Sequence, residues 1–292
     1  ERFGPADVLD AERTEYNCET CNVHNMLKLS HLLFSLTGDK KYADYDGWAY
    51  TNSILSSQNH ETGMSTYFQP MASGFFKVYS TREQDFWCCT GTGMENFTKP
   101  WAGVAFADDG TLYLTRLVSC TVTLPGVNVS LETDWLNGDA LTLHVAHCDR
   151  RIALRVPDWT DAASEGGWLY YDGAALDGRS VTLRFPRLLR SHSLPDAPQT
   201  RAYSFGPFLL SAGYATGTLR TDKTGVDVTV PTRDGDVREH LRAPELLPTG
   251  APCRFMLRSA DGWETELAPH FLKNQERYGI YFTVDDAAPQ KE

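Results

Sequence analysis

The sequence predicts an α+β protein of more than one domain, helical in its first third and built of β-strands after that. Apolar residues recur at helical spacing before about residue 106, and short alternating apolar runs follow from there on. The chain has 292 residues, which is long for a single domain. We therefore expect a helical domain over residues 1–106, a β-sandwich over 107–215 and a further β-rich segment over 216–292.

Three helices are expected in the first segment. The first ends at Gly38-Asp39, and its apolar face consists of Val23, Met26, Leu27, Leu33 and Leu36. A second amphipathic helix is expected over residues 42–55, and a third after Gly93, running toward Pro100. Residues 60–87, between the last two, form a long connection rich in aromatic residues. A connection of this length either lines a binding cleft or simply packs, and the sequence favours neither.

The strands are expected where short runs alternate between apolar and polar residues. These runs cover residues 111–118, 121–124, 141–145, 152–156, 181–185 and 208–211. Asn-Gly and Asp-Gly pairs, which favour turns, separate several of them. Many short strands at this spacing predict an antiparallel sandwich. Residues 253–257 and 278–284 predict further strands, whereas the Asp and Glu residues of 216–250 indicate solvated surface.

Composition and charge limit the partners. With 41% hydrophobic and 22% charged residues, the composition is that of an ordinary globular protein. No stretch approaches the roughly 20 apolar residues of a membrane span, so we expect no membrane partner. The net charge of −11 repels phosphate backbones, so we expect no nucleic-acid partner either. The start at Glu1 leaves localisation open, and nothing in the sequence determines the oligomeric state.

The cysteines indicate metal or thiolate chemistry. Seven cysteines are too few for a disulfide scaffold at this length, and four of them fall in two tight groups, Cys18/Cys21 and Cys88/Cys89. One interpretation is an all-cysteine structural zinc site made by these four. Another uses Glu19 with Cys21, Cys88 and Cys89, and leaves Cys18 out. A vicinal disulfide or two buried thiols at Cys88-Cys89 is the third, and the spacing alone does not choose between them.

Several segments carry a resemblance to a known family. The most specific are Tyr16–His24 (YNCETCNVH), Tyr67–Pro70 (YFQP) and Trp87–Asn96 (WCCTGTGMEN). Supporting segments are Arg155–Trp159 (RVPDW), Ala202–Leu210 (AYSFGPFLL) and Gln275–Phe282 (QERYGIYF). In this order they resemble the β-L-arabinofuranosidase group of glycoside hydrolases, families 127 and 146.

The resemblance implies a fold and a site. The fold would be the end of an (α/α)6 barrel followed by an antiparallel β-sandwich. The cofactor would be Zn²⁺, held by Glu19, Cys21, Cys88 and Cys89, with Cys88 as the catalytic nucleophile. The general acid/base would be Glu1, because Glu1–Pro5 is similar to the family segment that supplies that glutamate.

The implied function is that of a retaining glycoside hydrolase that releases terminal β-L-arabinofuranose from an arabinose-containing oligosaccharide or glycopeptide. Such a barrel needs more helices than the three expected here. We therefore expect the chain to be the C-terminal part of a longer enzyme, with apolar barrel surface left exposed and poor activity on its own.

Other residues receive more modest roles. His60, in the aromatic connection, is a candidate contact to the sugar, and Tyr67 could stack on a sugar face. His24 and His31 lie on the first expected helix, where a histidine is more often a packing residue than a ligand.

Two rival functions remain open at this point. One is a non-catalytic carbohydrate-binding β-sandwich with a structural zinc site, which would bind sugar but hydrolyse nothing. The other is a thiol redox protein that uses Cys88 and Cys89, which requires a reversible disulfide and no metal.

Overall fold

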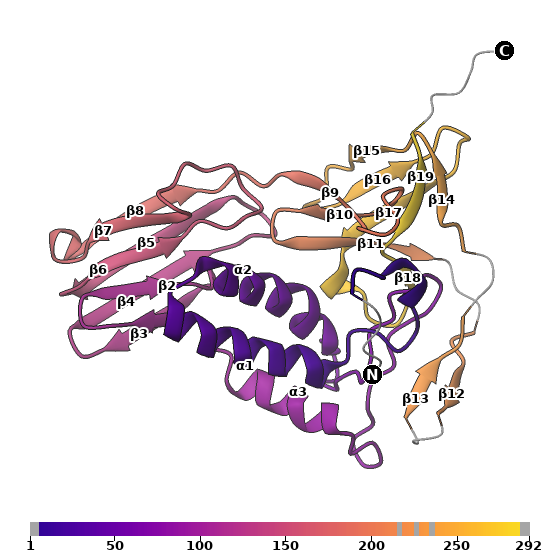
Figure 1. The fold of residues 1–292 in the computed structure, drawn as a ribbon, viewed down its shortest axis with the longest axis horizontal. Helices are drawn as coiled ribbons and strands as arrows, with labels where there is room; N and C mark the ends of the chain where they lie inside the picture. Colours follow the sequence, from indigo (N-terminus) through magenta and orange to yellow (C-terminus); the bar gives the residue numbers. More distant parts are fainter. Residues whose placement is uncertain (1–5, 215–217, 225–227, 234–236, 287–292) are drawn as a thin grey trace. The chain divides into compact units, whose positions relative to one another are not determined.

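The computed structural model describes residues 6–214, 218–224, 228–233 and 237–286, and strands dominate it, with few helices and several sheets (Figure 1). The contacts gather into two compact units. Unit 1 combines Glu1–His24, Thr51–Phe97 and Leu189–Glu292, whereas unit 2 combines Asn25–Tyr50 and Thr98–Leu188. Each unit is thus assembled from stretches that are separated in the sequence.

The described residues contain the three expected helices. They are α1 (Thr20–Thr37), α2 (Lys40–Ala49) and α3 (Cys88–Thr98). Short helical turns lie at Asp10–Glu12, Tyr50–Ile54, Leu55–Ser57, Ala174–Leu176 and His270–Leu272. None of the helices in the described part of the chain is both long and apolar enough to cross a membrane.

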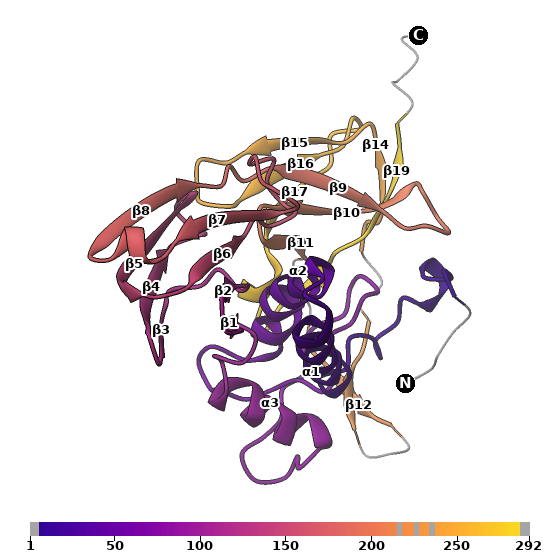
Figure 2. The same cartoon turned by 60° about the vertical axis from the view of Figure 1, so that its left-hand side comes forward.

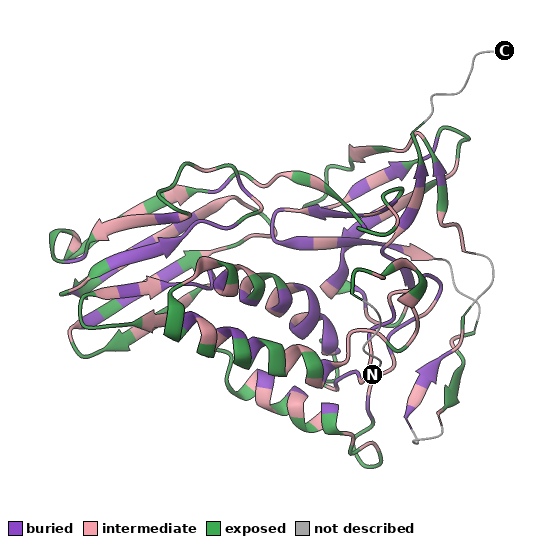
Figure 3. Cartoon of the chain, viewed as in Figure 1, coloured by how far each residue is buried: buried purple, intermediate pink, exposed green. Residues whose placement is uncertain are grey.

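Two details of the helices differ from the expectation. Helix α3 begins at Cys88, before the expected start after Gly93, because Gly93 is tolerated inside the helix and does not break it. The buried face of α1 also differs from the apolar face expected from the sequence. Leu27 is buried, but Met26 is 40% and Leu36 is 72% exposed. Figure 3 shows buried, intermediate and exposed positions along the helices. Apolar residues occupy too much of the circumference of this helix for spacing alone to choose the buried face.

Unit 2 contains two four-stranded sheets. One has the order β1-β2-β6-β7 and the other β3-β4-β5-β8. Their bounds are β1 (Ala105–Ala107), β2 (Thr111–Leu114), β6 (Arg151–Arg155), β7 (Trp168–Asp172), β3 (Cys120–Leu124), β4 (Val127–Thr133), β5 (Ala140–Cys148) and β8 (Arg179–Arg184). Both sheets contribute side chains to one hydrophobic core, for example Leu112 and Leu154 from the first and Leu143 from the second. Alternating burial along β2, β4 and β5 builds that core, whereas β6 is buried at four successive positions.

Unit 1 contains a nine-stranded sheet with its own core. The main path is β14-β19-β10-β11-β17-β16-β15, with β9 paired to β10 and β18 paired to β11. The bounds are β9 (Leu189–Ser193), β10 (Thr200–Phe205), β11 (Phe208–Tyr214), β14 (His240–Arg242), β15 (Glu245–Pro248), β16 (Phe255–Arg258), β17 (Glu264–Pro269), β18 (Arg277–Gly279) and β19 (Phe282–Asp285). A separate hairpin consists of β12 (Thr221–Lys223) and β13 (Thr229–Pro231), both visible in Figure 1.

The expected strands are confirmed, with two corrections to their pairing. The strands were expected to be antiparallel, but β2 pairs with β6, and β14 with β19, in parallel. For β2 and β6 the reason is topological, because the chain between them builds β3, β4 and β5 of the other sheet before it returns. The run expected at 278–284 is split, because β18 pairs with β11 whereas β19 pairs with β10.

Figure 2 shows β15, β16 and β17 of the nine-stranded sheet side by side. Within unit 1 the aromatic connection is fixed to the β18 segment. Phe75 forms a β-bridge with Tyr278, and the Gly74 N–H donates to the Tyr278 carbonyl over 2.9 Å. The hydroxyl of the buried Tyr278 donates to the Pro70 carbonyl over 2.8 Å. The connection is therefore held in place by these hydrogen bonds within unit 1. It leads directly into the first turn of α3.

Candidate metal centre

Four side chains converge where α1 and α3 begin. Glu19 immediately precedes α1, Cys21 lies in its first turn, and Cys88 and Cys89 open α3. One potential ligand atom from each of these four residues lies within 4.8 Å of all the others. The Cys89 Sγ lies 3.3 Å from the Cys21 Sγ, 3.9 Å from the Cys88 Sγ and 3.8 Å from the Glu19 Oε1.

These distances suit a tetrahedral zinc ion. Donors at about 2.3 Å from a tetrahedrally bound ion lie roughly 3.8 Å from one another, close to the separations observed around Cys89. Three thiols and a carboxylate are also a donor set that zinc accepts. The residues present therefore fit a zinc ion, and Glu19, Cys21, Cys88 and Cys89 are the residues that could hold it.

The same geometry separates the alternatives left open by the sequence. Cys18 is not part of the converging group, and its Sγ instead lies 2.9 Å from the Ser53 Oγ. An all-cysteine site would need this thiol. A separation of 3.9 Å between the sulfur atoms of Cys88 and Cys89 is far longer than a disulfide bond, and both cysteines are free thiols here. The geometry favours the group that contains Glu19.

The local surroundings favour the protonated form of two of these thiols. Burial raises the pKa of the Cys89 thiol well above its usual range, and it also raises the pKa of Cys21. A nearby cation favours the thiolate and opposes this effect. Both cysteines also lie in the first turn of a helix, where the partial positive charge of the helix end favours anionic ligands.

Cys88 is the exposed member of the group. Glu19 and Cys21 are half-buried and Cys89 is fully buried, whereas Cys88 is open to solvent. The Cys88 Sγ lies 3.5 Å from the Tyr67 Oη. This contact, followed by burial, raises the pKa of the Tyr67 hydroxyl. Tyr67 therefore keeps its proton at neutral pH, and its hydroxyl oxygen accepts the hydrogen bond from the Cys88 thiol.

Other contacts at the centre involve residues of the quoted segments that were not predicted as site residues. The Thr92 Oγ1 lies 3.0 Å from the Cys21 Sγ and donates to the Cys88 carbonyl over 3.1 Å. One turn further along, the His24 Nδ1 lies 2.7 Å from the Asn96 Oδ1 and joins α1 to α3. Thr92 lies four residues after Cys88, so the correct start of α3 is the one signal that could have indicated it.

The other residues predicted for the site lie as follows. The His60 Nε2–H donates to the Phe271 carbonyl over 2.8 Å, and a contact between His60 and sugar stays a prediction. His24 is engaged with Asn96, and the His31 Nε2 lies 2.6 Å from Asp46 in unit 2, as packing roles would require. Glu1 lies outside the described residues, so its role also stays a prediction.

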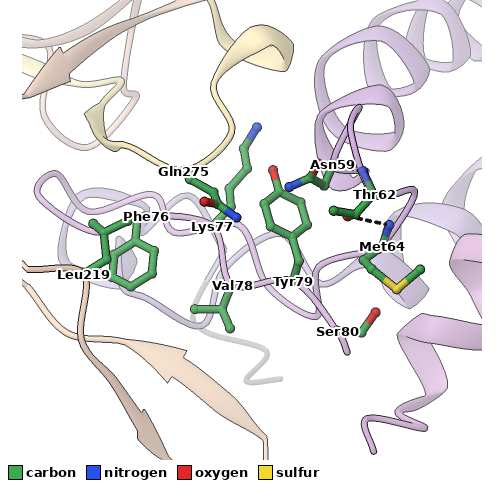
Figure 4. Close-up of a pocket in the computed structure, with 10 residues that line it drawn as sticks. All are labelled: Asn59, Thr62, Met64, Phe76, Lys77, Val78, Tyr79, Ser80, Leu219 and Gln275. Carbon is green, nitrogen blue, oxygen red and sulfur yellow. Dashed lines mark hydrogen bonds between the residues drawn. The ribbon is translucent and has the colours of Figure 1, made fainter. Parts of the chain in front are cut away.

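A cavity of about 370 Å³ lies elsewhere in unit 1 (Figure 4). The chain around Tyr79 lines it together with Leu219 and Gln275, and none of the four donors is among its lining residues. Lys77 contributes its stem to the wall, and its Nζ donates to the Ser56 Oγ and to the Lys273 carbonyl. We infer no binding site in this cavity, because the amine of Lys77, the one lysine that lines it, already donates hydrogen bonds to oxygen atoms of the protein.

Comparison with known proteins agrees with the geometry of the site. Residues 1–100 match the family model described as the beta-L-arabinofuranosidase GH127 catalytic domain, and all four donors lie in this stretch. This match covers 100 of the 292 residues. The resemblance expected from the motifs is thereby confirmed, and the chain is glycoside hydrolase-like in this segment. No curated protein matches the sequence.

Solved structures share the fold. A GH127 beta-arabinofuranosidase superposes with a TM-score of 0.69 at 15% identity, over 92% of this chain and 50% of its own. A structure described as a glycoside hydrolase superposes with a TM-score of 0.67 at 13% identity, over 91% of this chain and 52% of its own. A GH127 beta-L-arabinofuranosidase from Geobacillus stearothermophilus T6 superposes with a TM-score of 0.67 at 12% identity, over 94% of this chain and 51% of its own. The chain thus spans about half the length of each of these three structures.

Proposed function

We propose that the chain is part of a retaining glycoside hydrolase that releases terminal β-L-arabinofuranose from an arabinose-containing oligosaccharide or glycopeptide. The observation that carries this proposal is the exposed thiol of Cys88 within the four-donor group of the GH127 segment. In this proposal residues 1–106 are the end of an (α/α)6 barrel, 107–215 a β-sandwich and 216–292 a further β-rich segment.

The proposed cofactor is Zn²⁺ held by Glu19, Cys21, Cys88 and Cys89. When bound, the ion would keep the Cys88 thiol deprotonated at neutral pH. The buried position of Cys89 supports a holding role for that residue, and the exposure of Cys88 supports a reacting role. The Tyr67 hydroxyl would orient the Cys88 sulfur through the 3.5 Å contact.

The reaction would proceed in two displacements. In the first, the Cys88 sulfur forms a bond to the anomeric carbon while the bond to the leaving oxygen breaks and Glu1 protonates that oxygen. In the second, Glu1 takes a proton from water, the water oxygen bonds to the anomeric carbon, and the carbon–sulfur bond breaks. Each displacement inverts the anomeric centre, so the configuration is retained overall. His60 and Tyr67 are the proposed contacts to the sugar.

The proposal predicts that Cys88→Ser removes both metal and activity. We expect about one zinc per wild-type chain by elemental analysis and clearly less in the variant, because a hydroxyl is a poorer zinc ligand than a thiolate. The matched control is Cys120→Ser, which removes a half-buried thiol on β3 and should leave the zinc content unchanged. Wild-type chain without zinc, carrying a Cys88–Cys89 disulfide after reducing purification, would favour the redox alternative.

Activity is measured on the full-length protein with an aryl β-L-arabinofuranoside, with the first sugar anomer identified by NMR. We expect the β-anomer first, and a loss of hydrolysis of at least about 10³-fold in Cys88→Ser and in Glu1→Gln. Sugar binding without hydrolysis in the wild type would instead support the non-catalytic carbohydrate-binding module.

A further inference from the structure

The residue just before Glu19 has an unusual backbone conformation. Cys18 has φ = +50°, in the left-handed region that residues other than glycine rarely adopt. Such a conformation persists only where the surroundings determine it, and it is concentrated at functional sites. Here it changes the direction of the chain immediately before a donor of the candidate metal centre.

The residues on either side of this turn are fixed to the aromatic connection. The Gln69 N–H donates to the Asn17 carbonyl over 3.0 Å. The Thr20 N–H donates to the Tyr67 carbonyl over 3.1 Å, and the buried Thr20 hydroxyl donates to the Thr66 carbonyl over 2.9 Å. With Asn17 and Thr20 both held, the conformation of residue 18 determines where the Glu19 side chain is directed.

The side chain of Cys18 contacts the side chain of the buried residue Ser53. Its Sγ lies 2.9 Å from the Ser53 Oγ. The side-chain amide of Gln69, which is 1% exposed, donates to the Ser53 carbonyl over 2.9 Å and lies 3.4 Å from the Ser53 Oγ. Gln69 therefore fixes Ser53 through its side chain while it fixes Asn17 through its backbone.

We propose that Cys18 is a positioning residue for Glu19. The contact between the Cys18 thiol and Ser53 holds the left-handed turn, and that turn directs the Glu19 carboxylate toward Cys89, 3.8 Å away. If residue 18 relaxed to an ordinary φ, the following peptide would rotate and the carboxylate would leave the donor group. This inference rests on the metal centre of the proposed function and assigns a role to the one cysteine of the two clusters that is not a donor.

The test compares four substitutions of Cys18 in the 292-residue chain. Serine keeps a hydroxyl that can contact Ser53, glycine removes the side chain but accepts a positive φ without strain, and alanine and valine do neither. Zinc affinity is measured by competition with a chromophoric chelator. We expect Cys18→Ser to stay within a few-fold of the wild type, Cys18→Gly to be intermediate, and Cys18→Ala and Cys18→Val to be weaker by about tenfold or more.

Cobalt(II) substitution shows what has changed in the centre. The intensity of the thiolate-to-cobalt charge-transfer band reports the number of thiolate ligands, so it should stay unchanged per bound ion in every Cys18 variant. The ligand-field bands, which report geometry and the carboxylate ligand, should shift in Cys18→Ala and return in Cys18→Ser. A general loss of stability would not produce this pattern.

Cys253→Ala is the matched control. Cys253 is buried in unit 1 and also has a left-handed backbone, with φ = +55°, but it is not next to a donor. Its substitution should lower the thermal midpoint and leave zinc affinity unchanged.

The outcomes separate this inference from the function on which it rests. Wild-type zinc affinity in Cys18→Ala overturns the inference and leaves the metal centre intact. A charge-transfer band that weakens in both Cys18→Ser and Cys18→Ala overturns it as well, because Cys18 would then be a ligand. A wild-type chain that binds neither zinc nor cobalt contradicts the proposed function and this inference together.

Discussion

His270 is buried without a charge in unit 1. Its side chain is 2% exposed, and its Nδ1 lies 3.1 Å from the Ser211 Oγ. Burial lowers the pKa of His270 well below its usual range, and the positive charges of Lys77 and Lys273 lower it further. The folded protein therefore holds His270 neutral at a pH where the unfolded chain would protonate it.

This histidine should make the fold sensitive to acid. As the pH falls below about 6.5, His270 becomes protonated in the unfolded chain but not in the folded chain. The free energy of unfolding therefore falls by up to about 1 kcal/mol per pH unit. His270→Gln keeps a polar side chain near Ser211 but does not titrate. Denaturant midpoints between pH 5 and 7 should therefore depend less on pH in His270→Gln. Equal slopes for the two proteins would show that His270 is protonated in the folded state as well.

The sequence predicts donors better than it predicts what supports them. Cys21, Cys88 and Cys89 could be recognised because the family motif holds them at fixed local spacing. The contact of Ser53 with Cys18 and that of Gln69 with Ser53 could not, because they form only after distant parts of the chain have folded together. Such contacts leave no periodic or spacing signal.

At the scale of one element, α3 carries two interior glycines in different surroundings. A Cβ on Gly93 would lie 2.8 Å from the Ser65 Cβ and closer still to its Oγ, whereas a Cβ on Gly91 would meet nothing within 4 Å. Both glycines weaken the helix through backbone entropy. At Gly93 this cost permits a close approach between α3 and the aromatic connection.

The two glycines therefore make a matched pair. Gly91→Ala should stabilise the protein by roughly 0.5–1 kcal/mol, because alanine is the better helix former and the site is open. Gly93→Ala should instead destabilise it, because Ser65 must move. Thermal unfolding of the two variants tests this, and a stabilised Gly93→Ala would mean that α3 does not approach Ser65 so closely.

This pair also shows why the start of α3 could not be predicted. Gly91 and Gly93 reduce the intrinsic helix propensity of the segment, so the local sequence favours a loop. Tertiary contacts override that preference, among them the contact between Thr92 and Cys21. For α1 the signal was strong enough to predict the helix but too uniform to predict its buried face.

At the scale of the whole molecule, the two units interleave along the chain. Unit 1 draws on residues at the start, in the first third and in the last third, with unit 2 inserted twice between them. The strands themselves could be predicted from local patterns. Their assignment to units could not, because β9 joins the nine-stranded sheet only through pairing with β10.

The interleaving predicts that the metal centre depends on distant sequence. A chain that ends at residue 188 keeps all four donors but loses the partners of the segments between them. For example, the Asn52 side chain bonds the backbone of Pro207 and Leu209. We expect this shortened chain to bind zinc at least about tenfold more weakly than the complete one. The same chelator competition measures it, and unchanged affinity would show that residues 1–188 form the centre without the last third of the chain.

The bonds between the start and the end of unit 1 also determine how the protein is made. Cys21, Cys88 and Cys89 leave the ribosome before the strands from Leu189 onward, at a synthesis rate of roughly 5–20 residues per second. For several seconds the nascent chain therefore carries three thiols that the finished unit holds together and partly encloses. During that interval the three thiols are more open to oxidation and to capture of a metal ion than they are in the finished unit.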